Sequence, residues 1–240
     1  MSMSRRRIRA IVRKEIREYR RNRSVVVTMA IFPLIFLIQP LIIVLRLTES
    51  SSAALGQMHL LLYMLAIPLL TPAAVASTAV AGERQQGSLE PVLSTPIRRE
   101  EFLLGKALAA LVPSIAIAYA VYAAFVVSAV LFALPAVASA IIQGPDILAQ
   151  LLFTPLLAFL SIWIGLGIST RSSDVRVAQQ LSLLGCLPAV LVTSLIAFDV
   201  IHATLGLALG LGAVLLVLDG LGWRVVSPMF DRERLITGTR

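Results

Sequence analysis

The sequence predicts an all-α polytopic membrane protein that crosses the bilayer six times. The chain of 240 residues is 58% hydrophobic and has a mean hydropathy of +0.89, whereas about 45–50% of residues are apolar in an ordinary globular protein. Between Val25 and Gly222, several runs carry almost no charge. Each run has about 20 residues, which a helix needs to cross about 30 Å of hydrocarbon. Composition and spacing together exclude a soluble fold.

The order of polar and apolar segments divides the chain into three parts. We expect a cytoplasmic amphipathic helix in residues 1–24, a six-helix transmembrane domain in residues 25–222 and a cytoplasmic tail in residues 223–240. A polar loop, residues 82–106, separates the second span from the third. The six spans are predicted at residues 25–45, 58–81, 107–134, 151–169, 181–198 and 203–222.

The first predicted element is a basic amphipathic helix. Its apolar residues recur at helical spacing, while arginines fill most of the remaining positions; the apolar residues are Ile8, Ile11, Val12, Ile16 and Tyr19. Such a helix lies in the headgroup plane, with its apolar stripe towards the hydrocarbon and its guanidinium groups towards lipid phosphate. The alternative is a disordered tail that only sets the topology.

The distribution of positive charge places both termini in the cytoplasm. Ten of the 21 Lys and Arg residues precede the first span, and with the N-terminus inside only Arg46 lies on the outer side. Positively charged loops stay on the cytoplasmic side of a membrane. The same placement argues against nucleic acid as a partner, because a basic tail joined to a span marks topology. We expect a multi-pass protein of the cell membrane.

Few polar residues fall within the predicted spans. Asp219 lies near a cytoplasmic end, His59 and His202 lie on the outer side, and Gln39 is expected to form a hydrogen bond between helices. An ion-coupled carrier needs a carboxylate or broken-helix ion site near mid-membrane, and an enzyme needs a cluster of reactive groups. The single cysteine, Cys186, forms no disulfide framework or Cys-based metal site within the chain. We therefore expect neither an enzyme nor a cofactor.

The charged loop at 82–106 first suggests a phosphate-binding loop. Gly82 and Gly87 have the G-x-x-x-x-G spacing, but Ser88 stands where the lysine of such a loop is required. The preceding element is also a predicted membrane helix, whereas a phosphate-binding loop follows a strand. The nucleotide interpretation is therefore excluded.

The same loop has the pattern of a short amphipathic helix. Leu89, Val92 and Leu93 fall on one side of a helix that begins near Ser88, and the Thr95–Pro96 pair ends it. An exposed apolar edge flanked by charge suits a contact in which a helix lies in a groove of a partner. A solvated loop with some helix remains the alternative on these grounds.

The loop resembles that of ABC-2 type transporter permeases, the membrane subunits of a class of ATP-binding cassette exporters. Their pattern runs roughly G-E-R-x-x-G-[ST]-L-E-x-L-L-x-T-P-[IV]-x-R-x-E-x-x-x-G-K. This chain meets it at Gly82, Glu83, Arg84, Gly87, Ser88, Leu89, Glu90, Leu93, Thr95, Pro96, Ile97, Arg99, Glu101, Gly105 and Lys106. Val92 replaces the commoner leucine. The likeness extends in layout over the whole chain, with an N-terminal interfacial helix, six spans and this loop.

The resemblance implies that the loop forms a coupling helix, which docks in a cleft of a separate ATPase subunit. Leu89, Val92 and Leu93 would fill the cleft. Four charged residues would fix the orientation of the coupling helix: Glu83, Glu90, Arg99 and Glu101. Which charges face the ATPase and which brace the N-terminal helix stays open. The implied coupling residues are Glu83, Arg84, Gly87, Ser88, Leu89, Glu90, Val92, Leu93, Pro96, Arg99 and Glu101.

By the same likeness, the chain is half of the membrane part of an exporter in the bacterial inner membrane. Two copies of the ATPase and a second permease, identical or different, would complete the complex within the lipid. Two alternatives come from other classes of protein. One is an ATP-independent secondary transporter or channel, which the scarcity of intramembrane acids disfavours. The other is a membrane assembly subunit that transports nothing.

Overall fold

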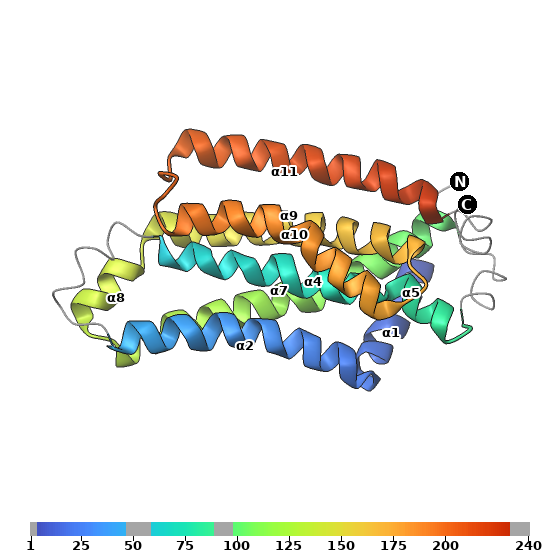
Figure 1. The fold of residues 1–240 in the computed structure, drawn as a ribbon, viewed down its shortest axis with the longest axis horizontal. Helices are drawn as coiled ribbons and strands as arrows, with labels where there is room; N and C mark the ends of the chain where they lie inside the picture. The colour runs from blue at the N-terminus through green and yellow to red at the C-terminus, as the bar shows by residue number, and fades with distance from the viewer. Residues whose placement is uncertain (1–3, 47–58, 89–97, 231–240) are drawn as a thin grey trace.

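The computed structural model describes residues 4–46, 59–88 and 98–230, and every regular element in these ranges is a helix (Figure 1). The elements are α1 (Arg5–Arg21), α2 (Arg23–Arg46), η2 (Leu60–Leu65), α4 (Ala66–Ala76), α5 (Thr78–Gln85), α7 (Arg99–Phe132), α8 (Pro135–Ile141), α9 (Gly144–Arg171), α10 (Val175–Ala197), α11 (Leu205–Val226) and η3 (Ser227–Phe230).

Within the described ranges, six segments are long and apolar enough to cross a membrane. They are Val25–Arg46, Leu60–Gln85, Arg99–Phe132, Gly144–Arg171, Val175–Ala197 and Leu205–Phe230. Large apolar side chains point outwards from these helices, among them Leu131 and Leu209, as a surface in contact with lipid requires. The predicted all-α fold with six transmembrane helices is confirmed.

The second span, formed by η2, α4 and α5, is the centre of the bundle. Of the residues in its most apolar stretch, 83% are buried, whereas only 6% are buried in the corresponding stretch of the sixth span, which contains α11. Helix α11 runs along one edge of the bundle (Figure 1). Small residues permit this close packing. At Gly165 on α9, an added Cβ would lie 2.7 Å from the carbonyl oxygen of Ala73 on α4. The predicted interhelical hydrogen bond of Gln39 is also present, donated by the Tyr63 hydroxyl at 3.0 Å.

Helix α1 packs against α7 at one end of the bundle, and α8 lies at the opposite end (Figure 1). We call these the α1 end and the α8 end. Ile11 and Tyr19, which the sequence assigned to a lipid-facing stripe, are buried in the protein core. Gly105 on α7 permits the contact, because an added Cβ would lie 2.5 Å from Ile11 Cγ2. The basic side of α1 remains exposed.

Candidate functional site at the base of the 82–106 loop

The structure describes both ends of the loop that carries the predicted coupling residues. Glu83, Arg84, Gly87 and Ser88 lie at the end of α5, and Arg99 and Glu101 lie at the start of α7. The other five predicted residues lie outside the described residues: Leu89, Glu90, Val92, Leu93 and Pro96. The site is therefore built from the two points at which the loop joins the bundle.

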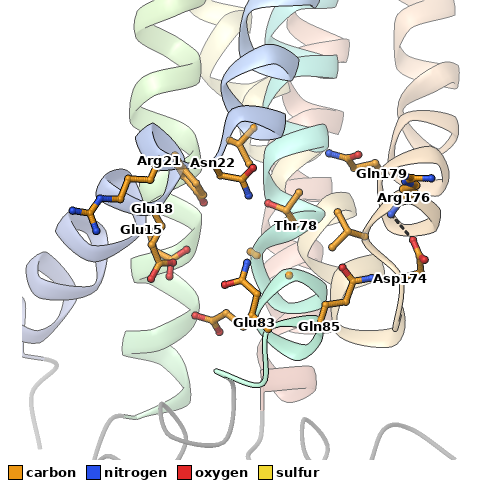
Figure 2. A pocket seen from close by; sticks show the side chains of 16 residues that line it. Glu15, Glu18, Arg21, Asn22, Thr78, Glu83, Gln85, Asp174, Arg176 and Gln179 are labelled. Atoms are coloured by element: carbon orange, nitrogen blue, oxygen red, sulfur yellow. Dashed lines mark hydrogen bonds between the residues drawn. The ribbon is translucent and has the colours of Figure 1, made fainter.

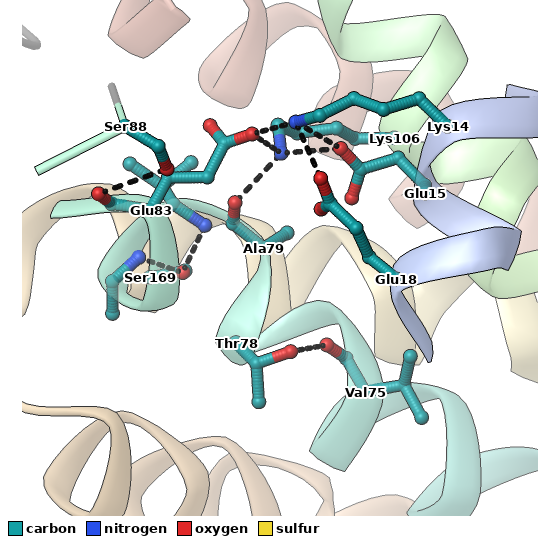
Figure 3. A network of polar contacts seen from close by, with 12 residues as sticks. Lys14, Glu15, Glu18, Val75, Thr78, Ala79, Glu83, Ser88, Lys106 and Ser169 are labelled. Atoms are coloured by element: carbon teal, nitrogen blue, oxygen red, sulfur yellow. Dashed lines mark hydrogen bonds and ion pairs between the residues drawn. The ribbon is translucent and has the colours of Figure 1, made fainter. Parts of the chain in front are cut away.

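Lys106 is the centre of the site. Its ammonium is fully buried and lies 3.1 Å from the carboxylates of Glu15 and Glu83 (Figure 3). It also donates a hydrogen bond of 2.7 Å to the Ala79 carbonyl and lies 4.9 Å from the ring centroid of Phe102. A buried charge is costly unless it is paired and hydrogen-bonded. Lys106 meets both conditions and joins α7 to α1 and α5.

Lys14 extends the same network from the solvent side. Its ammonium lies 2.7 Å from Glu83, 3.3 Å from Glu18 and 3.4 Å from Glu15. Burial lowers the pKa of Lys14, but the hydrogen bond to Glu83 and the three negative charges raise the pKa by more, so the side chain stays charged. We call Lys14, Glu15, Glu18, Glu83 and Lys106 the ionic cluster.

Arg84, the residue after Glu83, binds the end of α9. Its guanidinium donates to the carbonyl oxygens of Ser172 at 2.7 Å and Thr170 at 3.1 Å. The last carbonyls of a helix have no partner within the helix and carry partial negative charge, so a cation there is favourable. Val80 and Ala81 lie one turn before Arg84 on α5, and their backbone amides donate to the Ser169 hydroxyl of α9 at 3.0 Å. These bonds tie α5 to α9.

Glu101 joins the start of α7 to the start of α1. It is 1% exposed, and its carboxylate accepts from the backbone amide of Ser4 at 2.8 Å and from that of Arg98 at 3.3 Å. The Arg98 bond is half of a capping box, which satisfies a free amide at the helix start. The Arg7 guanidinium lies 3.4 Å away.

Gly87 ends α5 and directs the chain into the loop. Its φ is +65°, a left-handed conformation that glycine adopts at little cost. The amide of Ser88 then donates to the carbonyl of Glu83 at 3.0 Å, and the amide of Gly87 donates to that of Arg84 at 3.2 Å. These bonds close the last turn of α5 immediately before residue 89.

The described loop charges differ in the contacts that they make within the chain. Glu83 and Glu101 brace α1, Arg84 braces α9, and Arg99 is exposed on the first turn of α7. Sequence reasoning missed Lys14, Glu15 and Glu18. A signal was present in the sequence. The chain has 19 arginines and two lysines, and the two lysines are Lys14 and Lys106. The contacts that join them, such as Glu15 to Lys106 across 91 positions, are not local in sequence.

A pocket of about 760 Å³ opens beside the ionic cluster, between α1, α5 and α10 (Figure 2). Burial and the charge of Glu15 raise the pKa of the Tyr19 hydroxyl that lines it. Carboxylate oxygens of Glu15, Glu18 and Glu83 lie within 4.8 Å of one another, as metal ligands would. However, Lys14 already contacts all three acids, so the cluster offers little uncompensated charge to a cation.

Comparison with known families agrees with this architecture. The model of a family described as ABC-2 family transporter protein matches residues 9–221. The match begins in α1, includes both ends of the 82–106 loop and extends into α11. No curated protein matches the chain in sequence. The match covers far more than half of the chain and agrees with the six apolar helices, so the chain belongs to the ABC-2 transporter family and is a multi-pass membrane permease of that type.

Proposed function

We propose that this permease forms the translocation pathway of an exporter and receives its energy from a separate ATPase through the 82–106 loop. The observation that carries the proposal is the anchoring of both ends of this loop. The buried carboxylate of Glu83 joins one end to α1 and α7, the half-buried Arg84 joins the same end to α9, and the buried Glu101 joins the other end to α1. A loop that served only as a connection would not require such contacts at both ends.

The anchoring suits transmission of force. A push on the loop reaches α4, the centre of the bundle, through α5, and it reaches α9 through Arg84. Separating Lys106 from Glu15 and Glu83 would leave buried charges without partners, which costs several kcal/mol, about 3–5 by analogy with other buried pairs. The helices at the α1 end therefore move as one body, as a rigid-body switch between two states requires.

Within the loop, the proposed roles follow the described contacts. Glu83, Arg84 and Glu101 hold the base, and Gly87 and Ser88 set the direction of the chain. Leu89, Val92, Leu93 and Pro96 would form the docking surface, while Glu90 and Arg99 would orient it against the ATPase. These last assignments rest on the family pattern, since residues 89–97 lie outside the described residues and Arg99 is exposed.

The proposed complex has two ATPase subunits and two permeases in the lipid bilayer. We place the α1 end in the cytoplasm, and with it both termini, because the exposed arginines of α1 are at the same end as the loop. The bacterial inner membrane rests on the family likeness. ATP hydrolysis is assigned to the partner subunit.

A matched pair of loop variants tests the docking surface. Leu89→Arg places a charge on the apolar edge, whereas Gln86→Arg places the same charge on an exposed residue of the α5 end. Each variant is purified in mild detergent from its native membranes, and the proteins that accompany it are identified by mass spectrometry. We expect wild type and Gln86→Arg to retain a stoichiometric ABC ATPase and Leu89→Arg to lose it.

Two results would overturn the proposal. If Leu89→Arg retained the ATPase as well as Gln86→Arg does, the apolar edge would not be the docking surface. If wild type retained no ATPase even after gentle crosslinking, coupling itself would be wrong. Transport by an ion gradient alone would then identify a secondary transporter or channel, and its absence would indicate an assembly subunit.

A further inference from the structure

A second polar cluster lies at the α8 end, within the bundle. Asp146, Gln150 and Thr154 follow one another at four-residue intervals on α9, so they share one face of the helix. They are 2%, 0% and 0% exposed. His59, which precedes η2, lies 2.7 Å from the Asp146 carboxylate through its Nδ1. Tyr122 of α7 is also buried and lies within electrostatic range of Asp146. We call these five residues the polar file.

Most polar atoms of the file have no hydrogen-bond partner among the described residues. They are Asp146 Oδ2, both amide atoms of Gln150, and the hydroxyl oxygens of Thr154 and Tyr122. Several other hydroxyls in the spans bond to a carbonyl of their own helix, as Ser182 and Thr193 do. Thr71 and Ser114 are orphaned too, on α4 and α7. Buried polar groups are nearly always paired, so the file requires a partner.

The chemistry of the file identifies the partner. The Gln150 amide needs both an acceptor for its Nε2 and a donor for its Oε1. A bare cation would satisfy the oxygen and leave the nitrogen unpaired, and an anion would be repelled by Asp146. From Asp146 to Thr154 the file extends eight residue steps along α9, about 12 Å at about 1.5 Å per residue. This length is greater than that of one small molecule. Water both donates and accepts, a buried water makes about three hydrogen bonds to otherwise unsatisfied polar groups, and several waters can follow one another along the file.

We propose that the polar file lines an internal chain of water molecules that enters beside the His59–Asp146 pair and extends to Thr154. Thr154 is ten residues inside the start of α9, about 15 Å along the helix axis, and lies within the predicted fourth span. The α8 end of each permease is therefore hydrated within its own bundle, from His59 to Thr154. A small neutral solute with both donors and acceptors is the class of ligand that could replace the water. The outer location rests on the proposed orientation.

Cysteine accessibility tests the hydration. Cys186→Ser removes the single native thiol, and Gln150→Cys and Thr154→Cys then place one thiol in the file. Leu152→Cys is the matched control, since it lies at the same depth but is 58% exposed on the outside of the bundle, where lipid contacts it. Ser139→Cys on α8 is exposed and reports which face of the vesicle carries the α8 end. The probe is Ag⁺, whose reaction with each thiol is followed by intact-protein mass spectrometry.

We expect Ag⁺ added on the face that carries Ser139→Cys to modify both file thiols at least tenfold faster than the Leu152→Cys thiol. Rates no faster than that of the control would overturn the proposal. Faster modification from the opposite face would also overturn it, because the water would not enter beside His59. If Gln150→Cys fails to fold, Thr154→Cys, a smaller change, decides alone. The readout needs no ATPase, so it stays separate from the test of coupling.

Discussion

Replacing Lys106 with methionine removes the buried ammonium at the centre of the ionic cluster while keeping a long apolar side chain. Glu15 and Glu83 are 2% and 6% exposed, and each lies 3.1 Å from Lys106. Removing one member of a buried charged network leaves the others uncompensated, at about 3–5 kcal/mol. Lys14 still contacts both acids. We therefore expect a loss near the lower limit, about 3 kcal/mol in the free energy of unfolding.

Thermal unfolding in lipid nanodiscs measures this loss. For a chain of about 150–250 residues, 1 kcal/mol shifts Tm by about 2–4 °C, so we expect Tm to fall by about 6–12 °C. Lys14→Met is the matched control, because that side chain is 39% exposed. Solvent screens the half-exposed Lys14 ammonium, and Lys106 still pairs with Glu15 and Glu83, so we expect a smaller loss, about 1 kcal/mol.

A double variant separates charge from packing. Adding Glu83→Gln to Lys106→Met removes one of the stranded carboxylates, and we expect it to restore at least about 1 kcal/mol, as coupled neighbours do. Two results would refute the reasoning: a Lys106→Met protein within about 0.5 kcal/mol of wild type, or a double variant whose losses simply add. Either would mean that the cluster is not a network that holds α1, α5 and α7 together.

Two further substitutions test the braces around the cluster. In Gly105→Ala, the new Cβ would lie 2.5 Å from Ile11 Cγ2. We therefore expect α1 to be displaced and limited proteolysis of α1 to become several-fold faster. In Arg84→Ala, the carbonyls of Thr170 and Ser172 lose a charged donor; we expect a loss of about 1.5–3 kcal/mol and faster hydrogen exchange at the end of α9.

Each of these has an internal control. Gly82→Ala adds the same methyl group where nothing lies within 4 Å, so it should leave the proteolysis of α1 unchanged. Equal proteolysis of the Gly82→Ala and Gly105→Ala proteins would contradict the packing of α1 on α7. For Arg84→Ala, unchanged exchange at residues 170–174 would show that the guanidinium does not stabilise that helix end.

The amino-acid sequence by itself determined the six membrane helices and the family. The length of an apolar run is a local property, and the bilayer thickness converts it directly into a span. The G-E-R-x-x-G-S-L-E pattern at 82–90 is also local, so it identified the loop. Helix α1 was likewise predictable, because its apolar residues recur at helical spacing.

Only the tertiary structure decided which residues meet. Ile11 looked suited to lipid, but it packs on Gly105, because a stripe of that pattern fits a protein surface as well as a bilayer. Asp146 fell outside the predicted span at 151–169, but α9 begins at Gly144, and Asp146 pairs with His59 at a separation of 87 positions. Charge pairing between helices depends on their packing order and relative depth. Hydropathy specifies neither of these, so the ionic cluster and the polar file became visible only once the helices were placed together.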